Sequence, residues 1–275
     1  MKKIYTYIKK LTVKCLNDDI FEKTASASFY ILTTFFPFVI LIFIIASSIS
    51  LQMEDLLYRY LKIFPTDIVN IIFDMLANIS QSKLLVSTAL VMSLWTMSGA
   101  MMSVTKSFNK FYNVEETRNF VVLRLKCLVY AVLIIISIIS CFILIIFGSV
   151  IGNLMSKFIT EYDAQGIWNL TRFVFIIVAM CAVFAFLYKV IPNCRINVKA
   201  VLPGAIITTA LWIGMSIAFS FYVNNFAKYH IIYGSIAGIV MLITWIYMTS
   251  FIILIGGELN SVIHRLAKKN YKTVK

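Results

Sequence analysis

The sequence predicts an all-α polytopic membrane protein with about six transmembrane helices and short amphipathic helices at the membrane interface. Hydrophobic residues make up 61% of the 275 residues and charged residues only 13%, whereas soluble domains average roughly 45–50% apolar and about 25% charged residues. The mean hydropathy is +0.90. Long apolar runs without alternation, as in 133–140, favour helices over a transmembrane barrel.

A helix needs about 20 mainly apolar residues to cross a bilayer. In chain order the predicted spans are about 28–50, 84–105, 127–152, 170–191, 201–223 and 235–257. The fourth has only 16 charge-free residues between Arg172 and Lys189, and we expect both of these side chains to extend to the headgroups. Pro37 lies inside the first span and predicts a kink there. The chain is therefore expected to form one integral-membrane domain over 1–275.

Lys and Arg residues are unevenly divided between the two sides of this topology. One side has six in the N-terminal tail, five in 106–126, three in 189–199 and five after 260, whereas the other side has six in all. Because cytoplasmic loops carry the excess of these residues, both termini are expected in the cytoplasm. The asymmetry accounts for most of the net charge of +13. Membrane lipids are therefore the expected partners, and no nucleic acid is expected.

Three segments outside the spans have the spacing of amphipathic helices. In the N-terminal segment 1–24, apolar residues recur at helical intervals between lysines, as in a helix lying on anionic cytoplasmic lipid. The exterior segment 65–79 begins with Pro and Asp and carries an apolar stripe. The cytoplasmic segment 108–124 places aromatic residues on one face, and 258–275 is expected to be a basic cytoplasmic tail.

Glu258, at the cytoplasmic end of the last span, is the first candidate for a functional carboxylate, because ionisable groups in spans are costly. One hypothesis makes it a proton-binding or cation-binding group, reached through a cavity that Gly256 and Gly257 permit. The other makes it a structural carboxylate paired with a nearby base or a backbone donor, because an acid near a helix C-terminus opposes the helix dipole and needs a specific partner. Structural pairing is the favoured interpretation.

The cytoplasmic linker carries Asn109, Tyr112, Glu115 and Arg118 at intervals of three residues. These four are candidates for a cytoplasmic gate or a lipid headgroup contact. The favoured alternative is a polar loop or short helix held by ion pairs, each of which contributes little by itself.

Small residues and proline interrupt the last two spans near their expected starts. Pro203 and Gly204 predict a kink or break, and Tyr233 and Gly234 mark a second candidate break. Gly234 and Gly238 also have the GxxxG spacing that lets helices approach closely. Close helix packing is the favoured interpretation, and a break that lines a substrate cavity is the alternative.

Tryptophans occupy the middle of the predicted spans. Trp95, Trp212 and Trp245 favour packing in the interior, or stacking against an amphiphile, over a belt at the membrane interface. The candidate substrate or ion pathway consists of Glu258, Asn260, Tyr233, Gly234, Trp212 and Trp245.

Catalytic chemistry has little support in the sequence. The histidines, His230 and His264, fall on opposite sides of the predicted membrane. The sequence contains no HExxH, CxxC, P-loop or nucleophile-elbow motif. We therefore expect no catalytic residues, no metal site, no cofactor and no enzymatic activity.

The motifs of this chain resemble those of the YihY/BrkB family of bacterial inner-membrane proteins, over roughly residues 25–260. The matching residues are Ala25, Ala27, Tyr30, Phe36, Pro37, Asn109, Tyr112, Glu115, Arg118, Leu187, Tyr188, Pro192, Leu202, Pro203, Gly204, Ala205, Trp212, Tyr222, Phe226, Tyr229, Tyr233, Gly234, Ser235, Trp245, Tyr247, Gly257, Glu258 and Asn260. The family often has Gly-Ala-Glu where this chain has Gly-Gly-Glu, which leaves the carboxylate in place.

The resemblance implies six spanning helices and a place in the bacterial inner membrane. Some family members have been labelled ribonuclease BN. This sequence gives that label no support, because it lacks the clustered histidines and acids of two-metal phosphodiester cleavage.

Three functions from different classes fit these residues. The leading hypothesis is a transporter or flippase-like protein for a lipid or other amphiphile, because aromatic and small residues dominate the predicted interior and buried charge is scarce. The second is a proton- or Na⁺-coupled exchanger that uses Glu258. The third is a non-transporting envelope-assembly scaffold, a homo-oligomer packed through the face of Gly234 and Gly238.

Overall fold

The computed structural model describes residues 2–49, 83–155, 164–225 and 237–273 of the chain. All regular secondary structure in these ranges is helical, which confirms the predicted all-α polytopic class. The helices are α1 (Lys2–Asn17), α2 (Ile20–Ile49), α5 (Lys83–Tyr112), α6 (Phe120–Met155), α7 (Ala164–Val190), α8 (Val198–Asn225) and α10 (Ala237–Thr273).

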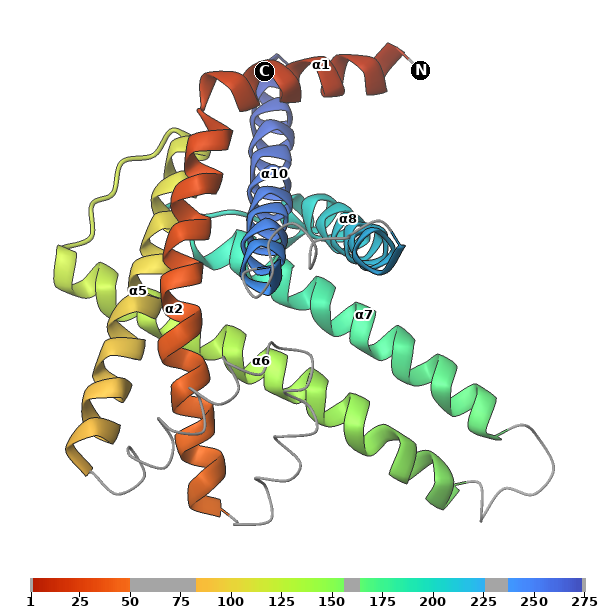
Figure 1. The fold of residues 1–275 in the computed structure, drawn as a ribbon. Coiled ribbons are helices and arrows are strands. Elements are labelled where there is room, and N and C mark those ends of the chain that lie inside the picture. Colours follow the sequence, from red (N-terminus) through yellow and green to blue (C-terminus); the bar gives the residue numbers. More distant parts are fainter. Residues whose placement is uncertain (1, 50–82, 156–163, 226–236, 274–275) are drawn as a thin grey trace.

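Helix α10 is the centre of the bundle, where it contacts α1, α2, α5, α7 and α8. Helices α2 and α5 lie side by side, and α6 and α7 form a second neighbouring pair that runs obliquely to them (Figure 1). Helix α1 lies across the end of the bundle at which α10 also ends (Figure 1). The N-terminal and C-terminal helices therefore meet on one side of the molecule.

Several helices are long and apolar enough to cross a membrane. Within the described ranges the candidate spans are Phe120–Ser137, Phe173–Val190, Val198–Val223 and Ala237–Arg265, with mean hydropathies from 1.8 to 2.5. The predicted spans 28–50 and 84–105 fall on α2 and α5, but α2 begins eight residues before the first span and α5 continues seven residues beyond the second. The total of six spans stays a prediction.

The three segments predicted to be amphipathic helices agree with the structure to different degrees. Helix α1 occupies most of the N-terminal segment. The segment 108–124 is not one element, because it contains the end of α5, an irregular link over 114–119 and the start of α6. The exterior segment 65–79 lies outside the described residues.

Asn113 ends α5 in the left-handed backbone region, with φ 52°. Its N–H donates to the carbonyl of Lys110 at 3.0 Å, and the N–H of Val114 donates to the carbonyl of Asn109 at 3.0 Å. This pair of bonds is the Schellman motif, and asparagine tolerates the left-handed conformation better than most residues. The chain is thereby turned out of α5 into the link that precedes α6.

Bulky aromatic side chains and two adjacent glycines bring α10 close to α5, α7 and α8. The ring centroids of Phe108 and Tyr188, both buried, are 5.6 Å apart. A Cβ at Gly256 would lie 1.8 Å from Oγ1 of Thr208, and one at Gly257 would lie 2.6 Å from the ring of Phe108. Only glycine fits at either position, because the neighbouring side chains fill the space that a methyl group needs.

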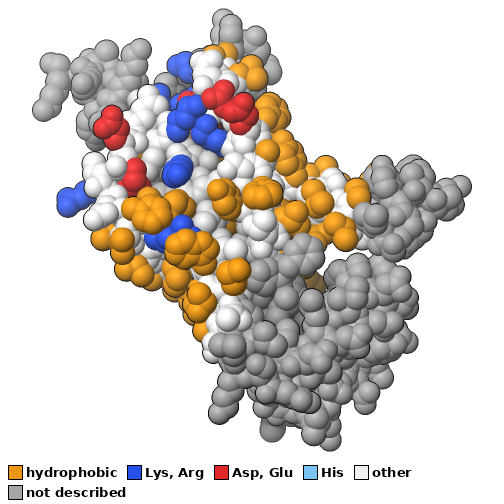
Figure 2. All heavy atoms as spheres, turned by 60° about the vertical axis from the view of Figure 1, so that its left-hand side comes forward, with side chains coloured by type: hydrophobic (Ala, Val, Ile, Leu, Met, Phe, Trp, Pro, Cys, Tyr) orange, Lys and Arg blue, Asp and Glu red, His pale blue; other side chains and the backbone are white. Residues whose placement is uncertain are grey.

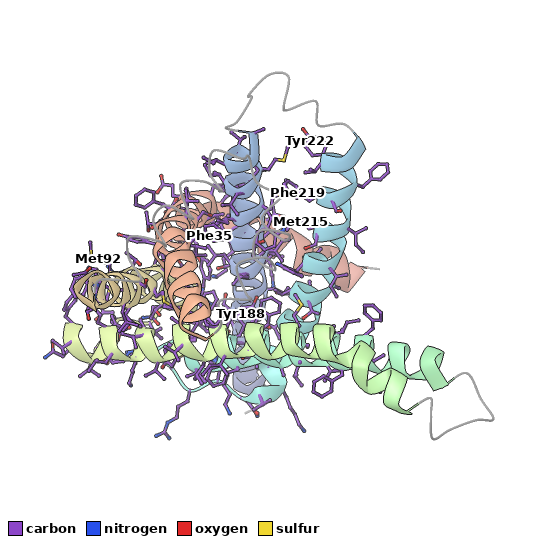
Figure 3. All side chains as sticks on the ribbon, turned by 60° about the horizontal axis from the view of Figure 1, so that its bottom comes forward. Phe35, Met92, Tyr188, Met215, Phe219 and Tyr222 are labelled. Carbon is purple, nitrogen blue, oxygen red and sulfur yellow. The ribbon has the colours of Figure 1, made fainter. Side chains whose placement is uncertain are left out.

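Figure 3 places Tyr188 near the centre of the bundle and Met215, Phe219 and Tyr222 along the side of α8 toward α10. The hydroxyl of Tyr188 lies 2.7 Å from Oγ1 of Thr208 and donates to the carbonyl of Ile253 at 2.9 Å. A buried phenol needs such partners, because an unsatisfied hydroxyl in an apolar interior is costly.

Pro203 lies inside α8, and Asn260 of α10 binds the backbone on both sides of it. The side-chain amide of Asn260 donates to the carbonyl of Val201 at 3.1 Å, and its oxygen accepts the N–H of Gly204 at 2.9 Å. Because proline disturbs the hydrogen-bond ladder of a helix, this amide supplies partners at the disturbance. The predicted break is thus filled by a side chain of the neighbouring helix.

We predict that Gly204→Ala lowers the stability of the protein. The new Cβ would lie 2.4 Å from the side chain of Asn260, and overpacking of this kind costs about 1–3 kcal/mol. Thermal unfolding in detergent measures the effect. Gly214→Ala in the same helix is the matched control, because nothing lies within 4 Å of its added Cβ and alanine is the better helix former. Equal melting temperatures for Gly204→Ala and wild type would contradict the prediction.

Candidate functional site

Glu258 is fully buried where α1 meets α10, and it forms an ion pair with Lys14. The ammonium of Lys14 also donates to Oδ2 of Asp18 at 2.7 Å and to the carbonyl of Phe111 at 2.9 Å. An ammonium has three donors, and each of them has an acceptor here. Arg265 donates to the same Phe111 carbonyl at 2.9 Å. One lysine of α1 therefore joins the start of the chain to both α5 and α10.

The cavity expected beside Gly256 and Gly257 is not there, because Thr208, Tyr188 and Phe108 occupy that space. Lys14 of α1 contacts Glu258 instead, so the carboxylate is paired with a base, one of the two kinds of partner that the structural hypothesis allowed.

Two buried oxygens of this cluster have no hydrogen-bond partner within the described ranges, Oε2 of Glu258 and the hydroxyl of Tyr112. The Tyr112 ring contacts the ring of His264, with centroids 5.9 Å apart. Burial raises the pKa of Tyr112, because the phenolate would lose hydration. Tyr112 is therefore a neutral hydroxyl at the inner end of the linker.

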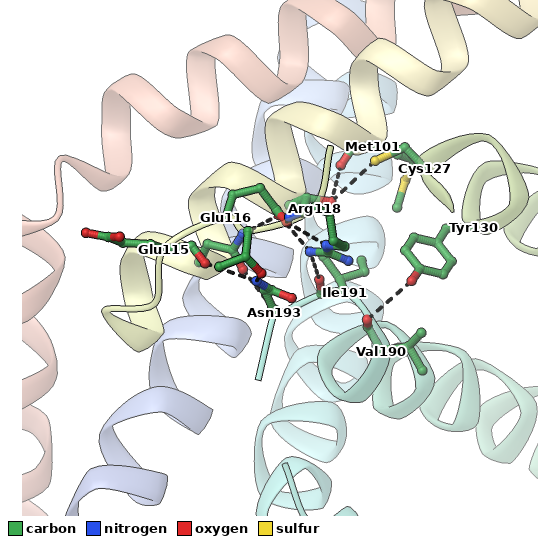
Figure 4. A network of polar contacts seen from close by, with 12 residues as sticks. Met101, Glu115, Glu116, Arg118, Cys127, Tyr130, Val190, Ile191 and Asn193 are labelled. Atoms are coloured by element: carbon green, nitrogen blue, oxygen red, sulfur yellow. Dashed lines mark hydrogen bonds and ion pairs between the residues drawn. The ribbon is translucent and has the colours of Figure 1, made fainter. Parts of the chain in front are cut away.

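A second network joins the linker before α6 to the end of α7 (Figure 4). Nε of Arg118 donates to Oε1 of Glu116 at 2.6 Å, and its Nη2 donates to Oε2 at 2.7 Å. Asn109 donates from its side chain to Oε2 of Glu116 at 2.8 Å and accepts the N–H of Asn193 at 2.8 Å. The same Arg118 Nη2 reaches the carbonyl of Ile191 at 3.3 Å.

Glu116, and not the predicted Glu115, is the carboxylate of this network. The side chain of Glu115 is exposed, and only its carbonyl takes part, as the acceptor for Asn193 at 3.0 Å. The bonds from Arg118 lower the pKa of Glu116 below its ordinary value. The sequence favoured Glu115 because it lies three residues after Tyr112 and three before Arg118. The bend of the link after α5 makes Glu116 the residue that faces Arg118.

The remaining predicted residues are dispersed. Trp212 and Trp245 contact each other edge to face between α8 and α10, with ring centroids 6.0 Å apart. Tyr233 and Gly234 lie outside the described residues, and Pro37 lies within α2, which continues through it.

A groove of about 740 Å³ runs between α2 and α5 and reaches the start of α6. It is lined by cations, hydroxyls and aromatic rings: Lys23, Ser26, Tyr30, Thr33, Trp95, Thr96, Gly99, Met102, Ser103, Lys106, Ser107, Lys110 and Arg124. Lys and Arg side chains gather in the upper part of the face seen in Figure 2, with hydrophobic side chains bordering them. Polar residues three or four positions apart over 23–33 and 95–110 were the sequence signal for this groove.

Arg124 is held in the groove by Trp95. Its guanidinium carbon lies 3.5 Å from the centroid of the Trp95 ring, and its Nη2 donates to the Trp95 carbonyl at 3.1 Å. Trp95 is 59% exposed, which excludes the interior packing that was one of its two predicted roles and leaves stacking against an amphiphile as a prediction. The exposed face is stabilised by a cation–π contact with a partly buried arginine.

Within the part of the chain that the structure describes, no three His, Cys, Asp or Glu side chains come together in a way that could hold a metal ion.

Comparison with known proteins identifies relatives along nearly the whole chain. A family model described as virulence factor BrkB matches residues 11–275. The chain is 32% identical over 251 residues to a putative ribonuclease-like protein, YfkH, of Bacillus subtilis (strain 168), a match that covers 90% of this chain and 91% of the relative. It is 26% identical over 256 residues to a UPF0761 membrane protein of Alteromonas mediterranea, covering 89% and 83%. No solved structure matches.

We predict that Lys14→Met destabilises the protein by about 3–5 kcal/mol, because it leaves a buried carboxylate without its cation. The double variant Lys14→Met/Glu258→Gln should recover most of that loss, since it removes the unpaired charge. Chemical unfolding in mixed micelles measures both variants and Glu258→Gln alone. If the losses of the two single variants simply add in the double variant, the ion pair does not stabilise the contact between α1 and α10.

We predict that Glu116→Gln lowers the melting temperature at pH 7 by about 2–5 °C. The lowered pKa of Glu116 means that its contribution is present above the ordinary carboxyl pKa and is lost as the pH falls through the lower value of the folded protein. The difference from wild type should therefore shrink on acidification. Glu115→Gln is the control, because its side chain is exposed. A difference that stays constant with pH would exclude a charged Glu116–Arg118 pair.

Proposed function

The chain belongs to the BrkB family of membrane proteins, and we propose that it moves a lipid or other amphiphile across the membrane, as a transporter or flippase-like protein. The observation that carries this proposal is the groove between α2 and α5. It combines cations, hydroxyls and aromatic rings on two helices that pack against each other.

An amphiphile crossing a bilayer needs a polar path for its headgroup while its tail stays in lipid. Along α5, the lining residues run from Lys110 to Trp95, which is about 22 Å at a rise of 1.5 Å per residue. The part of it inside the predicted span 84–105 runs from Ser103 to Trp95, about 12 Å, and leads from the cytoplasmic side into a hydrocarbon core of about 30 Å. The hydroxyls of Ser26, Thr33 and Thr96 line this path, where they would lower the cost of a polar headgroup at membrane depth.

The surroundings of the groove suit the tail of the same molecule. Tyr30 in α2, Trp95 in α5 and Phe120 in α6 are exposed large side chains. Side chains of this kind bury well against acyl chains. A substrate with both a polar and an apolar part fits this combination better than an ion does.

We infer that the protein lies in a bacterial inner membrane with both termini in the cytoplasm. The Lys14–Glu258 pair brings the N-terminal and C-terminal helices to one side, and the Lys-rich segments belong to that side of the predicted topology. The groove mouth at Lys23 and Lys110 would then open toward the cytoplasmic leaflet, whose anionic lipids attract basic residues.

Ion exchange through Glu258 is the second candidate. One observation favours it, the Oε2 oxygen that accepts no hydrogen bond from the described residues. Lys14 already neutralises this carboxylate, however, and a bound cation would have to displace an ammonium. We propose that the protein is not an enzyme. The ribonuclease-like name belongs to the Bacillus subtilis relative, and other relatives are named only as membrane proteins.

We predict that the purified protein in liposomes moves headgroup-labelled phospholipids between leaflets and that Gly99→Phe removes most of this activity. Gly99 lines the groove, and an added Cβ has only Tyr30 nearby at 3.5 Å, so a phenyl ring would fill the path without a backbone clash. The measurement is loss of label accessible to an impermeant quencher.

Gly214→Phe is the control for that assay, because it adds the same ring to α8 where nothing lies within 4 Å of the added Cβ. Vesicles with folded wild-type protein and no protein-dependent movement would refute general phospholipid flipping. Proton-driven cation flux that Glu258→Gln abolishes would favour the exchanger instead.

A further inference from the structure

We propose that the cationic end of the groove binds the phosphate of an anionic phospholipid, held by Arg124 of α6 and Lys106 of α5. This inference rests on the proposed function for its biological role, and it names the headgroup class that the groove accepts. The binding itself follows from the charges and contacts of the groove.

The groove has an excess of positive charge. Its lining includes Lys23, Lys106, Lys110 and Arg124 and no carboxylate among the described residues. Lys110 is neutralised by Asp19, with Nζ and Oδ2 2.6 Å apart. No ion pair involves Lys106 or Arg124 within the described ranges. Two cations therefore face the groove without a counter-charge from the residues that surround it.

Lys23 adds to this field from the opposite helix. Its ammonium donates to the carbonyl of Asp18 at 2.7 Å and not to a carboxylate. Burial, and then the nearby Lys110, lower the pKa of Lys23, whereas Asp19 and Asp18 act in the opposite direction.

The guanidinium of Arg124 is held in place and has donors available for a phosphate. Stacking on Trp95 fixes the plane of its guanidinium, and one Nη2 hydrogen is used by the Trp95 carbonyl. Its Nε is buried and has no hydrogen-bond partner in the part of the chain described. A phosphate oxygen would satisfy this donor, and guanidinium–phosphate bonds are among the stronger ones in proteins.

Hydroxyls lie beside the two cations. Ser26 of α2 and Ser103 of α5 are hydrogen-bonded across the groove at 3.0 Å, and Ser107 donates to the Ser103 carbonyl at 2.9 Å. Hydroxyl groups of this kind add hydrogen bonds to phosphate or glycerol oxygens.

The occupant is a lipid and not a soluble phosphate ester, because the site is continuous with exposed apolar side chains. Arg124 lies over the exposed rings of Trp95 and Phe120, with its guanidinium carbon 3.5 and 5.8 Å from their centroids. Val91, one turn from Trp95 in α5, and Val121, next to Phe120 in α6, are exposed as well. A soluble anion would use only the charges, whereas a phospholipid would also cover these side chains.

Native mass spectrometry of the full-length protein in detergent tests the proposal, with phosphatidylglycerol and phosphatidylcholine of equal chain length as probes. Wild type should prefer phosphatidylglycerol. Arg124→Gln and Lys106→Gln should each reduce that preference by about tenfold, the value of one charge-assisted bond. Arg124→Lys should retain part of it, since it keeps the charge and loses the planar donor.

Lys126→Gln is the matched control, because Lys126 is exposed on the same helix two residues from Arg124 and does not line the groove. Lys106 is exposed as well, so its substitution tests binding without endangering the fold. Equal preferences in wild type, Lys106→Gln and Lys126→Gln would overturn the proposal.

Displacement of bound phosphatidylglycerol by millimolar glycerol 3-phosphate would also overturn the assignment to a lipid. Detergent micelles permit no transport, so this result is independent of the flipping assay. Selective binding without flipping would support the phosphate site and refute the transporter. Flipping without a preference for the anionic lipid would support the transporter and refute the phosphate site.

Discussion

A buried ion pair between Lys14 and Glu258 is the interaction on which the arrangement of the bundle depends. Glu258 is 0% exposed and Lys14 only 15%, and a buried charge without a partner would be strongly destabilising. The pair therefore requires α1 to lie against α10. The same ammonium holds the Phe111 carbonyl near the end of α5, so one side chain connects three helices.

The position of α1 has consequences for the groove. The short turn at Asp19, with φ 52°, joins α1 directly to α2. Fixing α1 therefore also fixes the first turns of α2, where Lys23 and Ser26 face α5. The Glu116–Arg118 network holds the other side, because it connects the link before α6 to the end of α7. Arg124, in the first turns of α6 after that link, contacts Trp95. Both polar networks thus support the walls of the groove and lie outside its lining.

This division bears on the function of the BrkB family. The residues that looked most functional in the sequence, Glu258, Asn260 and Arg118, all have intramolecular partners that account for them. Unused bonding capacity among the described residues includes Oε2 of Glu258 and, in the groove, the buried Nε of Arg124. A transporter of anionic amphiphiles needs such unused groups at the place where the substrate enters, and it needs rigid contacts elsewhere.

The sequence by itself determined the helical membrane class, the approximate places of the long apolar helices that the structure describes, and the motifs of the family, because these follow from local hydropathy and spacing. It also favoured a specific structural partner for Glu258, either a base or a backbone donor. Only the tertiary structure decided that this partner is Lys14, 244 residues away, that Asn260 fills the break at Pro203, and that Glu116 replaces Glu115. Which residues distant in sequence become partners depends on how the helices cross, and local hydropathy does not determine the crossing geometry.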